Sequence, residues 1–206
     1  MPLPLLYLGG AALGALVLAD ERDKRKLLEH DRLLGRAPKT VNANTALIAA
    51  PSQWQKGFKT VSPIPGAIVC CYVFGVIEHT GIWLDDDCIV ELHGSGLIRA
   101  VSVKRFLAGR TGSQIFIACN HRHQPLVAED IAKTFGVSTD ESVIERAGRA
   151  IYQYRDYDLF DNNCHRFVWF CLTGDEESIK GFMALNQKLA GLFKQGIYWD
   201  EIKLKS

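Results

Sequence analysis

One cysteine, Cys164, stands where the sequence predicts the start of a helix. The run Asp161-Asn162-Asn163 precedes it, and Asn and Asp side chains cap helix N-termini by accepting hydrogen bonds from the backbone. We therefore predict a helix over residues 163–172 with Cys164 in its first turn. Unpaired N–H groups and the positive end of the helix dipole stabilise a thiolate there, which is the reactive form of cysteine. Cys171, further along the same helix, is predicted to pack in the core.

A thiol nucleophile needs a base, and His79, with the polar Glu91 twelve residues further on, lies in a stretch that could supply one. Glu91 lies in a short apolar segment that follows the acidic triplet Asp85-Asp86-Asp87. Asp favours turns and tolerates left-handed backbone, so we interpret the triplet as a hairpin turn rather than a metal site. In such a hairpin, His79 and Glu91 meet across neighbouring strands. Taken alone, His79 is more typical of a surface or core histidine than of a catalytic one.

Four short motifs occur in a fixed order along the chain: Pro65-Gly66, His79-Thr80-Gly81-Ile82-Trp83, Glu91, and Asn163-Cys164-His165-Arg166-Phe167-Val168. With them, over residues 62–175, the sequence resembles the lecithin:retinol acyltransferase (LRAT)-like proteins, a circularly permuted branch of the NlpC-type, papain-like cysteine enzymes. The resemblance implies that Cys164 is the nucleophile and His79 the general base. It also implies that Glu91 orients the imidazole and stabilises its cation.

The sequence departs from the family pattern at three places. Glu91 stands where the animal enzymes commonly carry a second histidine, and His165-Arg166 stands where they usually read Glu-His. Ile77 occupies the position, two before the histidine, at which they carry a tyrosine. Without that tyrosine, the backbone N–H of Cys164 is the expected donor to a developing oxyanion.

The elements expected around these residues are strands first and helices afterwards. Apolar patterning predicts strands over residues 67–77, 79–84, 88–92, 97–106 and 114–119, and helices over 128–135, 140–154, 163–172 and 175–195. Residues 37–65 are interpreted as a linker or an irregular cover because they are rich in Pro, Asn, Thr and Ser. This order predicts an α+β fold with an antiparallel sheet and packed helices. The resemblance narrows it to the circularly permuted papain-like (NlpC/LRAT) type.

The first part of the chain is apolar. Residues 2–19 carry no charged side chain. The length of this segment is at the short end of the range that spans a bilayer. Lys and Arg follow on the C-terminal side only, which predicts a membrane anchor with the remaining chain in the cytoplasm. The alternative is a hydrophobic helix packed against its own domain. The six cysteines include no CxxC pair, and they fit free thiols in a reducing compartment.

Composition and the remaining polar residues argue against other classes of function. Lys and Arg number 24 against 23 Asp and Glu, so the chain lacks the net positive charge typical of a nucleic-acid-binding protein. The segment Cys119-Asn120-His121-Arg122-His123, with His93, does not have the paired spacing of zinc ligands, and we interpret it as a strand end or loop. The sequence predicts neither a metal nor a cofactor. The apolar stripe of the 175–195 helix is interpreted as a face that docks on the core.

Together these features predict four regions: a membrane-anchor helix over 1–19, a charged helix and linker over 20–61, an LRAT-like catalytic domain over 62–175, and a helical tail over 176–206. The predicted function is a membrane-tethered acyltransferase or acyl hydrolase that acts on a membrane lipid ester through an acyl-thioester. Two alternatives remain open at this stage. One is an amidase or cysteine peptidase of the NlpC type, and the other is a membrane-tethered binding module without catalysis.

Overall fold

The computed structural model describes residues 54–73, 77–108, 114–127, 142–158 and 163–203. The chain divides into two compact units, Met1–Ser52 and Gln53–Ser206, and all the described residues belong to the second. The elements of that unit, in chain order, are β1 (Trp54–Val61), β2 (Ile68–Val73), β3 (Ile77–Asp85), β4 (Cys88–Leu92), β5 (Ile98–Ser102), α2 (Val103–Leu107), β6 (Phe116–Cys119), α4 (Val143–Ala150), α5 (Cys164–Thr173), α6 (Phe182–Phe193) and β7 (Ile197–Ile202).

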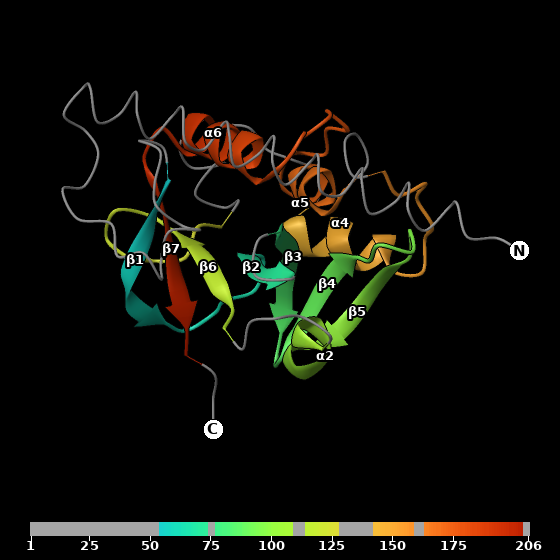
Figure 1. Ribbon diagram of the computed structural model, residues 1–206, viewed down its shortest axis with the longest axis horizontal. Helices are drawn as coiled ribbons and strands as arrows, with labels where there is room; N and C mark the ends of the chain where they lie inside the picture. Colours follow the sequence, from blue (N-terminus) through green and yellow to red (C-terminus); the bar gives the residue numbers. More distant parts are fainter. Residues whose placement is uncertain (1–53, 74–76, 109–113, 128–141, 159–162, 204–206) are drawn as a thin grey trace, which may run out of the picture. The chain divides into compact units, whose positions relative to one another are not determined.

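A sheet of seven strands organises this unit. The strands follow one another in the order β1-β7-β6-β2-β3-β4-β5, and Figure 1 shows α4, α5 and α6 together along one side of them, with α2 apart beside β4 and β5. The fold is therefore mixed α+β, as predicted. All neighbouring strands pair antiparallel except β1 and β7, which run parallel.

The hairpin of β3 and β4 forms as the sequence predicts. Asp86 and Asp87 turn the chain with backbone φ angles of 30° and 72°, in the left-handed region that Asp tolerates. The turn brings Ile82 opposite Val90 and Trp83 opposite Ile89, all four of which are fully or almost fully buried. β5 then pairs with β4 along its whole length, which makes β4 an inner strand with a partner on each side.

Four secondary-structure predictions need correction. Residues 54–61 form β1, although they lie in the stretch predicted to be irregular, and residues 197–202 form β7, which follows the helices. The strand predicted over 97–106 ends at Ser102, whose hydroxyl accepts a hydrogen bond from the backbone N–H of Arg105 and thereby caps the short helix α2. The strand predicted over 67–77 is β2, which ends at Val73.

Several predictions lie outside the described residues, namely the apolar helix over 1–19, the charged helix that follows it, and the helix over 128–135. In the part of the chain that the structure describes, no helix is both long enough and apolar enough to cross a bilayer.

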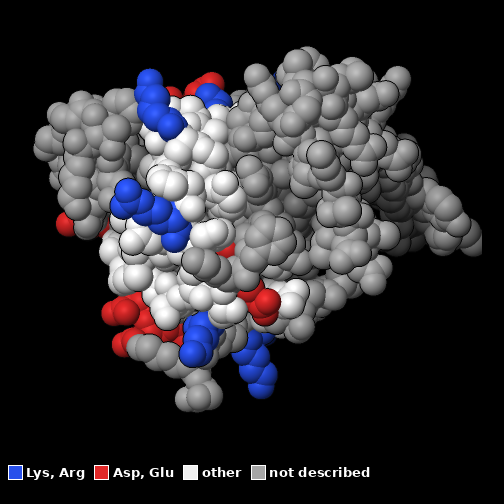
Figure 2. Space-filling model, turned by 90° about the vertical axis from the view of Figure 1, so that its left-hand side faces the viewer, with Lys and Arg blue, Asp and Glu red and all other residues white. Residues whose placement is uncertain are grey.

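The core is apolar and holds most of the cysteines. All six cysteines are free thiols, and every one except Cys88 is buried. The strands contribute side chains such as Val69, Trp83 and Ile117 to a continuous cluster, and Phe106 of α2 covers it. Four charged side chains of the described residues are nevertheless buried, namely Glu78, Glu91, Arg146 and Asp200. On the face in Figure 2 the basic and acidic residues are interspersed.

Candidate active site

The β3–β4 hairpin brings His79 and Glu91 into direct contact. Nε2 of His79 lies 2.6 Å from Oε2 of Glu91, and both side chains are buried. In the register of the hairpin Glu91 lies beside Gly81, and His79 is two residues earlier on the same face of β3. A side chain would not fit at position 81, because a Cβ on Gly81 would lie 2.8 Å from Cγ2 of Ile89. The predicted contact between His79 and Glu91 is therefore present.

The next strand, β5, supplies a cation for the same carboxylate. Arg99 lies directly opposite Glu91 in the β4–β5 pairing. Its Nε and Nη2 atoms lie 2.8 Å and 2.7 Å from Oε1 of Glu91. The Glu91 carboxylate has no exposed surface, so its negative charge needs such partners in place of water. One oxygen of Glu91 thus faces Arg99, and the other faces His79.

The helix α5 presents Cys164 at its first position. Asn163 caps the helix: its side-chain oxygen accepts hydrogen bonds of 3.0 Å from the backbone N–H groups of His165 and Arg166. Its amide nitrogen donates at 2.8 Å to the carbonyl of Ile179, which ties the cap to the segment before α6. The helix end that carries Cys164 is therefore fixed in place, as the Asn163 cap predicted.

A second histidine lies against the thiol. Nδ1 of His165 is 3.9 Å from Sγ of Cys164 and 3.1 Å from Oγ1 of Thr80 on β3. The His165 ring also packs on Phe182 of α6, with 5.8 Å between ring centroids. His79 packs in a similar way on Phe106 of α2, at 5.3 Å. Both imidazoles are thus held by an aromatic ring and by a polar partner.

These surroundings give Cys164 an unusual acidity. Burial raises the pKa of its thiol, but the charges and hydrogen bonds of His165 and His79 outweigh burial and hold that pKa well below its ordinary value. Cys171 on the same helix shows the opposite behaviour, because burial raises the pKa of its thiol and nearby Arg155 and Arg146 only partly oppose this. Of the two cysteines on α5, only Cys164 has the environment of a reactive thiolate.

Comparison with known families agrees with this geometry. Residues 62–177, more than half of the chain, match the family described as lecithin retinol acyltransferase. The chain belongs to the lecithin retinol acyltransferase family. At the level of this family, acyltransferase or acyl-hydrolase activity is expected, and the family is typically thiol-dependent. No curated protein sequence matches the chain closely enough to count as a relative.

The structure brings all three sequence-predicted residues, Cys164, His79 and Glu91, to one place. Sequence reasoning did not single out Arg99 or Thr80, and it read His165 only as a departure from the family pattern. The usable signal was chemical, namely a second imidazole next to the predicted nucleophile, although side chains at adjacent helix positions do not normally face each other. Arg99 and Thr80 carry no such signal, since their contacts depend on strand register and on the packing of α5.

The polar segment Cys119-Asn120-His121-Arg122-His123 forms contacts with other residues of the same unit. Nδ1 of His123 lies 3.0 Å from Oδ2 of the buried Asp200 on β7, and His121 contacts Gln195. Burial, with the nearby charge of Asp200, raises the pKa of the Cys119 thiol. Among the described residues, no group of three or more His, Cys, Asp and Glu side chains is arranged to hold a metal ion.

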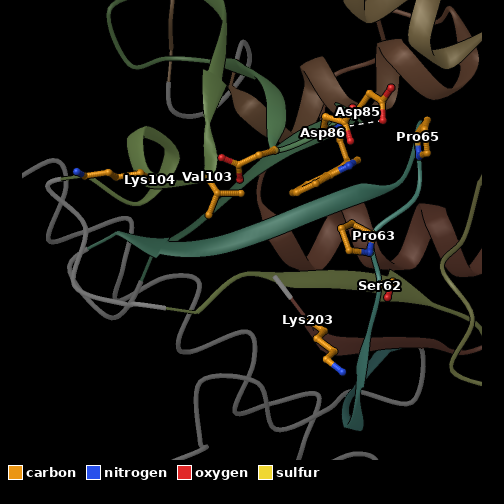
Figure 3. A pocket seen from close by; sticks show the side chains of 10 residues that line it. Ser62, Pro63, Pro65, Asp85, Asp86, Val103, Lys104 and Lys203 are labelled. Carbon is orange, nitrogen blue, oxygen red and sulfur yellow. Dashed lines mark hydrogen bonds between the residues drawn. The ribbon is translucent and has the colours of Figure 1, made fainter. Parts of the chain in front are cut away.

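A cavity of about 680 Å³ lies elsewhere on the molecule, and Cys164, His79 and Glu91 are not among the residues that line it. It is bounded by the Asp85–Asp87 turn, by α2 and by the segment before β2, as Figure 3 shows for Asp85, Val103 and Pro63. It is lined by Ser62, Pro63, Pro65, Trp83, Asp85, Asp86, Asp87, Val103, Lys104 and Lys203. The cavity is therefore separate from the candidate active site.

Proposed function

We propose that the protein is a thiol-dependent enzyme that takes an acyl group from a lipid ester as a thioester on Cys164. The observation that carries the proposal is the convergence of Cys164, His79 and Glu91 within a chain of this family. A thiol of lowered pKa at a helix N-terminus is the usual form of an activated cysteine nucleophile. The family name refers to lecithin, which makes a glycerophospholipid the first donor to test.

In the first half-reaction, His79 takes the proton of the Cys164 thiol and Sγ attacks the ester carbonyl. Because Nε2 of His79 faces Glu91, Nδ1 is the ring nitrogen that exchanges the proton with sulfur. Glu91 holds the imidazole in that orientation and stabilises its cation. The tetrahedral intermediate then expels the alcohol, to which His79 returns the proton, and the acyl group remains on sulfur.

The oxyanion of this intermediate needs hydrogen-bond donors. Asn163 accepts from the backbone N–H groups of His165 and Arg166, while Cys164 stands at the first helical position. The backbone N–H of Cys164 points out of the helix end and is the proposed donor. In the second half-reaction, a water, amine or hydroxyl gives a proton to His79 and attacks the thioester, which regenerates the thiol.

Two finer features belong to the same proposal. The order His79, Glu91, Cys164 along the chain is the order that circular permutation of a papain-like enzyme would give. Residues 2–19 would anchor the protein in a membrane with the enzyme domain on the cytoplasmic side, because Lys and Arg follow them and do not precede them. Labelling of the domain cysteines by a membrane-impermeant reagent on intact cells would overturn this orientation.

The proposal is tested by mass spectrometry of the full chain after incubation with phosphatidylcholine vesicles. We expect one fatty-acyl adduct on Cys164 that hydroxylamine removes, as a thioester requires. Cys164→Ala should abolish the adduct, and the matched variant Cys171→Ala, on the same helix, should retain it. The proposal fails if phospholipid leaves no adduct and Cys164 is alkylated no faster than Cys171 at neutral pH.

A further inference from the structure

Two consecutive residues of β3 meet two consecutive residues of α5. His79 acts on Cys164 through charge and a hydrogen bond, and Thr80 Oγ1 lies 3.1 Å from Nδ1 of His165. The same Nδ1 lies 3.9 Å from Sγ of Cys164, within hydrogen-bonding reach of a sulfur atom. All four side chains are buried, so water does not compete strongly for these contacts. The sulfur atom is therefore flanked by two imidazoles, each held by β3.

The chemistry of the partners decides what His165 does at Nδ1. A thiolate can only accept hydrogen bonds, so Nδ1 must carry a hydrogen to interact favourably with it. The hydroxyl oxygen of Thr80 can accept from the same N–H, so this hydrogen is shared between Thr80 and the sulfur, and the contact with Thr80 holds the His165 ring beside Cys164. The Phe182 ring, which packs on His165 from α6, offers no competing acceptor of comparable strength.

We infer that His165 is a second catalytic histidine, whose Nδ1–H donates to the Cys164 thiolate while the contact with Thr80 holds the ring in place. The two histidines have different roles: His79 carries the proton that leaves sulfur, and His165 donates a hydrogen bond to the charged sulfur through Nδ1–H. The inference rests on the proposed function, because it assigns a partner to the proposed nucleophile.

The neighbouring side chain supports a specific role for His165. Arg166, which is adjacent in the sequence, is only partly buried and forms an ion pair with Glu176, with Nε 3.4 Å from Oε2. His165 instead occupies a buried position with a hydrogen-bond partner on another element. A buried polar group placed beside a reactive sulfur contributes most when that sulfur is charged.

The test compares two substitutions of similar size. His165→Asn keeps an N–H group close to the place of Nδ1, whereas His165→Leu removes every donor. The readout is the rate of Cys164 alkylation by iodoacetamide against pH, measured on the full chain by peptide mass spectrometry. Labelling of the buried Cys171 in the same digest reports unfolding.

We expect His165→Leu to slow alkylation of Cys164 about tenfold near pH 6, because a hydrogen bond to a charged group is worth this order. The rate should recover at alkaline pH, where the thiol ionises without help. His165→Asn should stay within about threefold of the wild type on the same reasoning. Thr80→Val should reproduce part of the loss, and Thr80→Ser, which keeps the hydroxyl, should not.

An unchanged pH profile for His165→Leu, with Cys171 still protected, would overturn the inference. So would equal losses for His165→Asn and His165→Leu. If His165→Leu exposes Cys171 to labelling, the comparison of Thr80→Val with Thr80→Ser becomes the test. Equal pH profiles of Cys164 alkylation for these two variants would overturn the inference. The outcome is separable from the proposed function: a selectively alkylated Cys164 that never forms an acyl adduct removes the proposed reaction and leaves the histidine's role intact.

Discussion

Replacing Glu91 by Gln should inactivate the site by trapping His79 in the wrong tautomer. Oε1 of Glu91 lies 2.7 Å from Nη2 of Arg99, and a guanidinium offers only donors. In Glu91→Gln the amide oxygen must therefore face Arg99, which turns the amide NH2 group toward Nε2 of His79. That nitrogen then accepts a hydrogen bond, so the ring proton moves to Nδ1, which can no longer take the proton of the Cys164 thiol.

The size of the effect follows from the same geometry. An amide that replaces the carboxylate of a catalytic triad and imposes the wrong tautomer lowers kcat by about 10⁴-fold in serine proteases. A loss of about 10³- to 10⁴-fold is expected here, which is roughly 4–6 kcal/mol in the barrier. Stability should fall as well, by about 3–5 kcal/mol, because the carboxylate is fully buried and its charge is paired with Arg99.

The assay is the single-turnover rate of acyl-thioester formation on Cys164, followed by mass spectrometry, with thermal unfolding as the check on folding. The control is a second substitution that frees the amide. In Arg99→Leu/Glu91→Gln the amide can rotate its oxygen to His79, so the double variant should react at least about tenfold faster than Glu91→Gln alone. The reasoning is refuted if Glu91→Gln reacts within tenfold of the wild type, or if the double variant shows no recovery.

Two further predictions concern α5, the helix that carries the proposed nucleophile. Because the pKa of the Cys164 thiol is held well below its ordinary value, its alkylation rate should change little as pH falls from about 8 to 6. The alkylation rate of Cys171, whose pKa is raised, should stay negligible. Parallel pH profiles for the two cysteines would contradict the assigned environment. Arg146 donates hydrogen bonds of 2.7 Å and 2.9 Å to the carbonyls of Cys171 and Leu172. Arg146→Leu should therefore lower the free energy of unfolding, measured in urea, by about 2–4 kcal/mol. A change below about 0.5 kcal/mol would show that these hydrogen bonds do not hold the end of α5.

Local patterns predicted the part of the fold that contains the β3–β4 hairpin and α5. The acidic triplet and the apolar segments around it fixed β3, β4 and their turn, and the Asn163 cap fixed the start of α5. β1 and β7 escaped prediction because their pairing is parallel and joins segments far apart in the sequence. α2 was not predicted for a local reason: the Ser102 cap starts a short helix at the end of an apolar stretch.

For the site, the sequence predicted the residues whose types carry chemistry, and it left out those that support them. His79 and Glu91 are separated by one predictable turn, so their contact could be expected. Arg99 reaches Glu91 only because β5 pairs with β4 in a register that places the two opposite each other. A shift of that register by one residue would turn Arg99 to the other face of the sheet, and no short sequence pattern determines this.

The position of β7 between β1 and β6 has a consequence for how the protein is made. A ribosome completes β1 long before β7, because residues 62–196 are synthesised between them. At a translation rate of about 5–20 residues per second, this interval lasts roughly 10 s. The β2–β5 meander, which holds His79 and Glu91, can pair during that time, while β6 keeps the edge that β7 will fill open to other chains. The nascent protein thus forms the β3–β4 hairpin before it can bury that edge, and in this interval it should depend most on chaperones.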